Sequence, residues 1–308
     1  MKVLVAGATG AIGRPLLPLL ESAGHDVIGL SRAARPGPGR MLAVDALDRS
    51  AVSTVMREVA PDAVVNMLTA IPARLKPRRI AAEFAATNRL RTEGTRHLLD
   101  AARDVGVHRV IAQGLAYAYE PSDAGIANED EPLWRRPPAA FAPVVAALRE
   151  LEASTTQAGG TVLRLGHLYG PGTMFAADGS FVADVRAGKV PLVGGGASVF
   201  SFIHVDDVAT AVLAALDRET PGVLNVVDDD PAPIRDWLPV MAGLLDAPRP
   251  RRMPRAVVRL VAGGWGAAYL GALRGADNAR ARLALDWRPR HRSWRAGLAH
   301  ELTAQVVP

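Results

Sequence analysis

The sequence contains no cysteine in its 308 residues. This absence excludes disulfide bonds, thiolate metal ligands and a cysteine nucleophile, and it fits a cytoplasmic protein. The seven histidines show no H-x-x-x-H or similar ligand spacing, and no G-x-S-x-G sequence marks a serine-hydrolase nucleophile. We therefore predict neither a metal site nor a Ser-His-Asp hydrolase.

Long uninterrupted apolar runs are also missing. Met1 leads directly into a short apolar stretch rather than into a basic leader region, so we expect no secretory signal. The most apolar late segment, residues 256–273, is interrupted by Arg259 and by several glycines. We therefore expect no membrane span and a cytoplasmic location.

Lysine is scarce, although the chain is basic. The formal net charge is +5, and lysine occurs only at positions 2, 76 and 189, so arginine supplies the other 33 of the 36 basic residues. The arginines form small scattered clusters without interleaved aromatic side chains, which a single-strand nucleic-acid binder would need. We interpret them as a solvated basic surface and predict no nucleic-acid partner.

A glycine-rich motif follows the first apolar stretch. Residues 2–6 are typical of a buried strand, residues 7–13 read G-A-T-G-A-I-G, and residues 14–20 are typical of a helix. Glycine permits positive φ angles and close approach of the backbone, and a helix N-terminus attracts anions. This order predicts a diphosphate cradle, with the cofactor contacted by Gly7, Thr9, Gly10, Ala11, Ile12 and Gly13.

The end of the second expected strand, residues 25–30, indicates which dinucleotide binds. An acidic residue there would accept hydrogen bonds from the ribose 2′-hydroxyl of NAD. The sequence instead places Ser31 and Arg32 there, with Arg35 nearby. Because arginine pairs with phosphate through two hydrogen bonds, we favour NADP(H) over NAD(H).

Strands and helices alternate through the first half of the chain. Further strands are expected at residues 41–44, 63–68, 109–113 and 161–165, with helices at about 80–105 and 139–157 among those between them. This alternation predicts a doubly wound parallel sheet of the Rossmann type, which binds ligands at the carboxyl ends of its strands. Additional cofactor contacts are predicted at Asp45, Ala46, Met67, Leu68, Thr69, Asn88 and Gln113.

The second half of the chain is more mixed. We predict a dinucleotide-binding domain over residues 1–165 and a smaller α/β substrate lobe over residues 166–308. Segments of that second half at about 199–227 are expected to return to the first domain. A strand is expected near residues 199–207, and helices are expected at 237–245 and 256–273.

Taken together, these motifs resemble those of the short-chain dehydrogenase/reductase superfamily, of the extended NAD-dependent epimerase/dehydratase type. The resemblance covers nearly the whole chain, and it implies a substrate cleft beneath the smaller lobe. It rests on six motifs in the family's order, at residues 7–13, 45–48, 87–95, 163–172, 202–208 and 285–289.

One departure from the family is large. The resemblance implies a Ser or Thr after the fifth strand and a Tyr-x-x-x-Lys pair on the next helix, where the lysine lowers the tyrosine pKa. Ala116 stands at the expected Ser/Thr position, and residues 140–150 contain neither tyrosine nor lysine. None of the four tyrosines has a lysine four residues later.

Three interpretations remain open. The chain is an NAD(P)-dependent oxidoreductase or epimerase of a small, secondary-metabolite-like molecule, with Tyr117, Tyr119 or His167 as substitute proton donor. Histidine is favoured among these because it titrates near neutrality. Alternatively, it is a non-redox dehydratase, cyclase or isomerase, or a protein that senses NADP without catalysis. A small-molecule substrate is the expected partner, and a homodimer is left open.

Overall fold

The computed structural model describes residues 1–33, 39–122 and 125–303 of the chain. Its main feature is a parallel sheet of seven strands in the order β11-β6-β5-β4-β1-β2-β3. This arrangement confirms the predicted doubly wound sheet, because the chain moves outward from β1 in one direction and then in the other. The strands are β1 (Lys2–Ala6), β2 (Asp26–Ser31), β3 (Arg40–Ala43), β4 (Ala63–Asn66), β5 (Arg109–Leu115), β6 (Thr161–Leu165) and β11 (Gly222–Val226).

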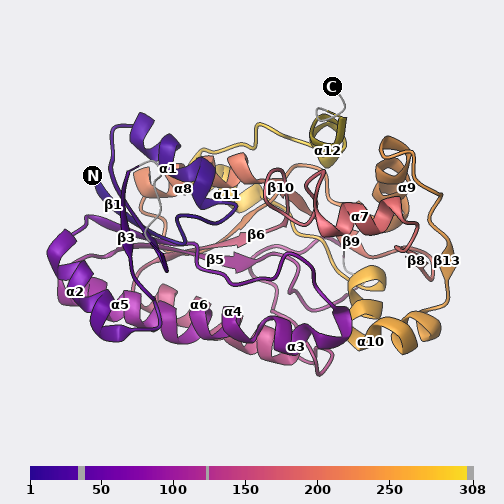
Figure 1. Cartoon of the computed structure of the whole chain (residues 1–308), viewed down its shortest axis with the longest axis horizontal. Helices are drawn as coiled ribbons and strands as arrows, with labels where there is room; N and C mark the ends of the chain where they lie inside the picture. Colours follow the sequence, from indigo (N-terminus) through magenta and orange to yellow (C-terminus); the bar gives the residue numbers. More distant parts are fainter. Residues whose placement is uncertain (34–38, 123–124, 304–308) are drawn as a thin grey trace.

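Helices cover both faces of this sheet (Figure 1). One face carries α1 (Gly13–Ser22), α8 (Val205–Asp217) and α11 (Ala279–Leu285), and the other carries α2 (Arg49–Val59), α5 (Thr95–Asp104) and α6 (Ala142–Gln157). The central strands are therefore mostly apolar, as in β1, where Val3, Leu4 and Val5 are fully buried. Alternate residues of β1 and β4 contribute to two separate apolar cores.

The helix expected over residues 80–105 is divided into consecutive segments of different helical type. It comprises η1 (Pro77–Arg79), α3 (Ile80–Glu83), α4 (Ala85–Arg89), the π-helical turn η2 (Leu90–Gly94) and α5. Single π-helical turns inside helices are frequent at functional sites. The predicted helical stretch is confirmed, and its π-helical turn is a detail that the sequence did not indicate.

The smaller lobe lies beyond the carboxyl edge of the sheet, at the right of Figure 1. Three short strand pairs and four helices form it around a core rich in aromatic side chains. The elements are β7 (His167–Tyr169), α7 (Ser180–Arg186), β8 (Leu192–Val193), β9 (Val199–Phe200), β10 (Phe202–His204), β12 (Ala232–Pro233), α9 (Ile234–Leu244), β13 (Arg252–Met253), α10 (Arg255–Gly271) and α12 (Trp294–Thr303).

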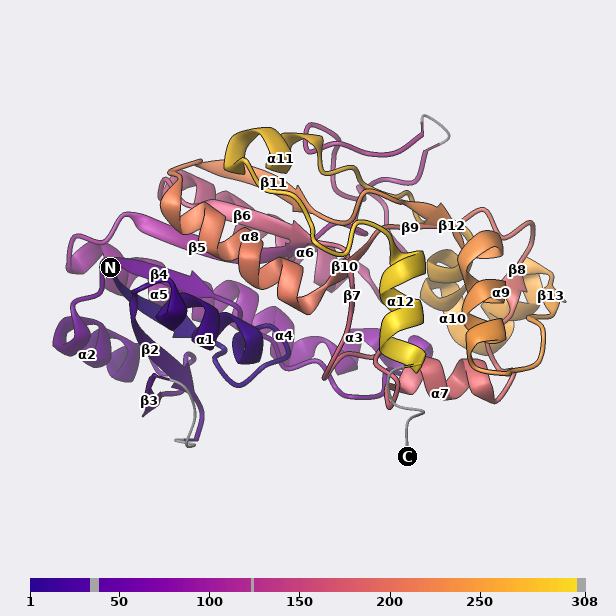
Figure 2. The same cartoon turned by 90° about the horizontal axis from the view of Figure 1, so that it is seen from above.

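The chain crosses between the two parts more than once. The predicted boundary after residue 165 falls between β6 and β7, and β11 then extends the main sheet beside β6. Seen from above, α8 lies along α1 (Figure 2), and α11 packs against β11. Within the described residues, no helix is both long enough and apolar enough to cross a membrane.

Candidate functional site

The turn after β1 is shaped by glycines that no other residue could replace. Gly7 has φ +92°, and a Cβ atom there would lie 2.6 Å from the carbonyl oxygen of Met67. A Cβ atom on Gly13 would lie 2.3 Å from the carbonyl oxygen of Ala8. Contacts this short are not tolerated, so a residue with a side chain cannot replace either glycine without moving the backbone. The two glycines thereby allow the turn to pack closely on itself and against the residues that follow β4.

The same turn leads into the N-terminus of α1. Thr9 and Gly10 are exposed, Ile12 is the N-cap residue, and the first N–H groups of a helix have no intrahelical acceptors. A Cβ atom on Gly172 would lie 3.6 Å from the Cβ atom of Ala11, so a loop of the smaller lobe reaches the turn. The turn therefore fits a diphosphate, because it offers backbone N–H groups and its glycines let the backbone approach the ligand closely.

The end of β2 is open to solvent. Arg32 is exposed, and the Ser31 hydroxyl donates to the carbonyl oxygen of Ala33. Arg35, which the sequence places nearby, lies outside the described residues. Asp45 is exposed beyond β3, and its carboxylate accepts from the N–H of Leu47.

The other predicted cofactor contacts lie at neighbouring strand ends. The Gln113 amide nitrogen on β5 lies 3.5 Å from the carbonyl oxygen of Leu68, and Thr69 is exposed just beyond it. The buried Oδ1 of Asn88 has no hydrogen-bond partner among the described residues, so it can accept one from a ligand. Met67 and Ala46 are buried, and the Ala46 carbonyl oxygen lies 3.0 Å from Nδ1 of His97.

Tyr117 and His167, both proposed from the sequence as proton donors, are in direct contact. Their rings stack with centroids 4.5 Å apart, and the other face of the imidazole stacks on Phe200 at 4.1 Å. Phe175 and Tyr269 meet the imidazole ring edge-on. The two candidates therefore belong to one aromatic cluster of the smaller lobe.

This apolar environment keeps both side chains neutral near pH 7. Burial lowers the pKa of His167 to about 3, although its hydrogen bond to the carbonyl oxygen of Ser201, 3.2 Å away, opposes the shift. Burial also raises the pKa of Tyr117, while the nearby Arg91 lowers it by a smaller amount. An imidazolium is therefore not the acid that this site favours at neutral pH.

The buried imidazole predicts a specific pH dependence of stability. Below about pH 6.5 the unfolded chain takes up a proton at His167 and the folded chain does not, so stability falls as the pH falls. Between about pH 7.5 and pH 5, wild type should lose roughly 2 kcal/mol more unfolding free energy than His167→Gln. Urea unfolding of both proteins at the two pH values measures this difference, and equal losses would contradict the buried neutral state.

Tyr119 lies in a different environment from Tyr117. Its hydroxyl donates to Oδ1 of Asn225 at 2.7 Å and accepts from Arg164 at 2.8 Å. Arg164 in turn forms a buried ion pair with Glu152 of α6 at 2.7 Å. Burial raises the pKa of Tyr119 to about 12, although Arg164 opposes the shift. These contacts fit a structural role for Tyr119.

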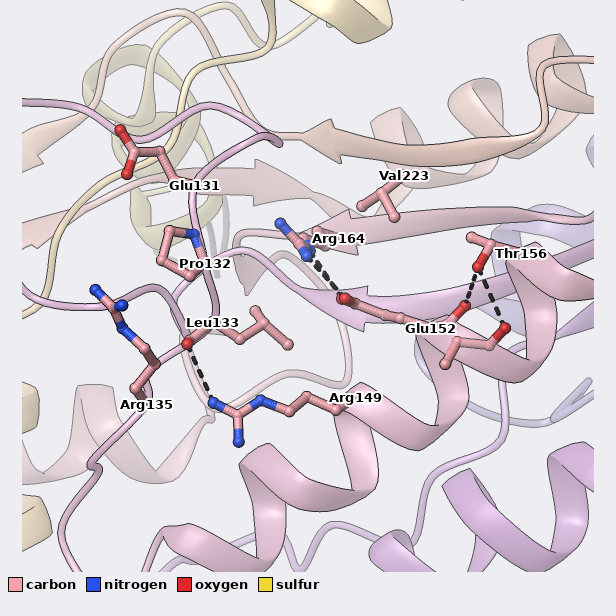
Figure 3. A pocket seen from close by; sticks show the side chains of 10 residues that line it. Glu131, Pro132, Leu133, Arg135, Arg149, Glu152, Thr156, Arg164 and Val223 are labelled. Atoms are coloured by element: carbon pink, nitrogen blue, oxygen red, sulfur yellow. Dashed lines mark hydrogen bonds and ion pairs between the residues drawn. The ribbon is translucent and has the colours of Figure 1, made fainter.

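A groove of about 660 Å³ lies beside this ion pair, between α6, the loop at residues 131–135 and strands β6 and β11 (Figure 3). Its cationic side chains already have protein partners. Arg149 donates to the carbonyl oxygens of Leu133 and Trp134, and Arg164 donates to Glu152. The groove thus borders the flank of the sheet, away from the glycine turn, and we do not assign the cofactor or substrate to it.

One buried charged residue near Tyr117 was not predicted as a site residue from the sequence. Arg91, on the π-helical turn η2, is 3% exposed, and its Nε and Nη1 atoms have no hydrogen-bond partner among the described residues. Burial lowers its pKa to about 10, so it keeps its charge near pH 7. Its spacing could have indicated burial, because Arg91 lies four residues after Thr87 and four before Thr95. All three lie on the buried face of the helical segment.

Comparison with known proteins gives consistent matches. The model of the NAD dependent epimerase/dehydratase family matches residues 3–226. The chain is 47% identical to a Streptomyces 3-diazoavenalumate denitrifying reductase, over 98% of this chain and all of that one. It is 27% identical to the dTDP-4-dehydro-6-deoxy-D-allose reductase of Streptomyces bikiniensis, covering 82% and 83% of the two chains.

A solved structure is also similar. Human epimerase family protein SDR39U1, crystallised with NADPH, superposes with a TM-score of 0.74 and 25% identity, covering 98% of this chain and 99% of the other.

Proposed function

The chain belongs to the NAD-dependent epimerase/dehydratase family and is an NAD(P)-dependent oxidoreductase, and from that premise we propose that it reductively removes a diazo group from an aromatic acid. The nearly full-length similarity to a denitrifying reductase supports this substrate class. The observation that carries the proposal is that the predicted site holds no ordinary acid/base pair. Helix α6 has neither tyrosine nor lysine, and His167 is buried and neutral.

The proposed reaction explains why that pair is dispensable. A carbonyl reductase must protonate the oxygen that becomes an alcohol, and this is the usual task of a tyrosine. An arenediazonium ion instead accepts a hydride, its C–N bond breaks, dinitrogen leaves, and a C–H bond takes its place. One hydride is consumed, and no oxygen atom changes its protonation state.

The residues of the chain have separate tasks in this proposal. The turn at residues 7–13 would hold the diphosphate, and Asn88 and Gln113 would contact the nicotinamide half. A bound reduced nicotinamide would supply the hydride. Tyr117 is partly exposed and would stack on an aromatic substrate with the ring face that does not contact His167. The buried rings of His167 and Phe175 behind it would exclude water from the diazo group.

The test uses purified protein, NADPH and diazotised 3-aminobenzoate. We expect loss of NADPH absorbance and formation of one benzoate and one dinitrogen for each NADPH, well above the rate without protein. A dTDP-4-dehydro-6-deoxy sugar should be reduced much more slowly. Reduction of the sugar without enhanced benzoate formation would contradict the proposal, and so would binding of NADPH with no turnover of either compound.

We also propose that NADPH is the preferred cofactor, because Arg32 is exposed at the end of β2, where the adenosine ribose is expected. Replacing Arg32 with alanine removes a charge-assisted hydrogen bond to the 2′-phosphate, so NADPH affinity should fall by about 10- to 100-fold. NADH affinity should change by less than about twofold, because NADH has no phosphate there. Titration calorimetry with both cofactors measures this, and equal losses would contradict the assignment.

A further inference from the structure

The guanidinium of Arg91 is buried and lacks a strong partner. Its side chain occupies a core position of the helix, yet two of its nitrogen atoms have no protein partner among the described residues. Leaving buried donors unsatisfied costs free energy, and a buried charge without a counter-ion costs more. Such a group in a native structure therefore calls for an explanation, and a bound anion would supply one.

The neighbours of Arg91 offset its charge only weakly. Its guanidinium carbon lies 5.8 Å from the ring centroid of Phe84, near the outer limit of a cation–π contact. Tyr117 is the one ionisable group of the described chain that raises the pKa of Arg91, and that phenol is itself neutral at pH 7. The carboxylate nearest in sequence, Glu93, is paired with the exposed Arg89 at 2.8 Å.

The position of Arg91 favours the substrate side of the site. Phe84 belongs to the aromatic core that the smaller lobe shares with residues such as Phe175 and Phe200, and Tyr117 packs against the same core. Tyr117 is partly exposed, and the proposed function places its ring against the substrate. The diphosphate cradle, in contrast, borders the core formed around α1 and α8.

We propose that Arg91 binds the carboxylate of the substrate through N–H groups of its guanidinium. This deepens the proposed function, because it identifies the residue that selects an aromatic acid among aromatic compounds. A planar carboxylate matches the guanidinium and would supply the missing counter-charge. The diazo-bearing ring would then lie against Tyr117.

The experiment measures binding without turnover. Cinnamate and its uncharged analogue cinnamamide are titrated into the NADP⁺-saturated protein by calorimetry. Wild type should bind cinnamate at least about 30-fold more tightly, and Arg91→Gln should bind the two compounds alike. Arg89→Gln, which alters an exposed arginine of the same helical segment, is the matched control and should behave like wild type.

Several outcomes would overturn the proposal. They are no binding of cinnamate to wild type, equal binding of both compounds to wild type, and loss of NADP⁺ rather than cinnamate affinity in Arg91→Gln. If Arg91→Gln does not fold, Arg91→Lys replaces it and should retain a reduced preference for cinnamate. Because neither ligand contains a diazo group, failure of diazo reduction would leave this result independent.

Discussion

Replacing Gly7 with alanine is expected to abolish cofactor binding. The new Cβ atom would lie 2.6 Å from the carbonyl oxygen of Met67, on a backbone with φ +92°. The turn would have to move away from β4, and the N–H groups at the start of α1 would lose their alignment with the diphosphate. Affinity for NADPH should fall by at least about 100-fold, measured by calorimetry.

Gly24→Ala is the matched control for this prediction. Gly24 also has a positive φ, +83°, but no atom lies within 4 Å of the Cβ position that alanine would introduce. Both variants bear a backbone penalty of about 1–2 kcal/mol, whereas only Gly7→Ala meets a steric clash at the turn. Equal NADPH affinity in the two variants would show that residues 7–13 are not the cradle.

The sheet could be predicted, and the cradle proposed, because their sequence signals are local. A short, mostly apolar strand, three spaced glycines and a helical stretch occupy the first twenty positions. The alternation of strands and helices then left few possible topologies. The long helix at 80–105 shows the limit, because no residue type marks a π-helical turn.

Contacts between distant segments could not be predicted in the same way. The buried carboxylate of Asp207 accepts from the backbone N–H groups of Arg290 and His291, more than eighty residues away. Tyr119 and Tyr117 are two residues apart, yet one hydroxyl joins an ion-pair network and the other ring stacks on His167. Regular alternation would place residues two apart on the same face, but both tyrosines lie after the end of β5, where the backbone no longer alternates. The sequence alone therefore left both tyrosines as candidates.

The largest loss of stability is expected from Glu152→Gln. Glu152 pairs with Arg164 through two hydrogen bonds of 2.8 and 2.7 Å, and the side chains are only 11% and 6% exposed. Burial lowers the pKa of Arg164, while Glu152 and Tyr119 together raise it above its usual value. An arginine guanidinium also keeps its proton near pH 7 without a carboxylate partner, so the variant holds an unpaired charge. A buried cation without its counter-ion should reduce the unfolding free energy by about 3–5 kcal/mol, measured by urea unfolding.

Two controls separate the unpaired charge from other effects. Glu93→Gln breaks an exposed pair with Arg89 and should cost no more than about 1 kcal/mol. Combining Glu152→Leu with Arg164→Met removes both charges and should recover much of the loss, since apolar replacements of buried ion pairs are often neutral. A double variant as unstable as Glu152→Gln would indicate that the hydrogen bonds of Arg164, including the one to the Tyr119 hydroxyl, matter more than the unpaired charge. In either case NADPH affinity should stay within about twofold of wild type, because β5 and β4 separate Arg164 on β6 from β1 and the turn that follows it.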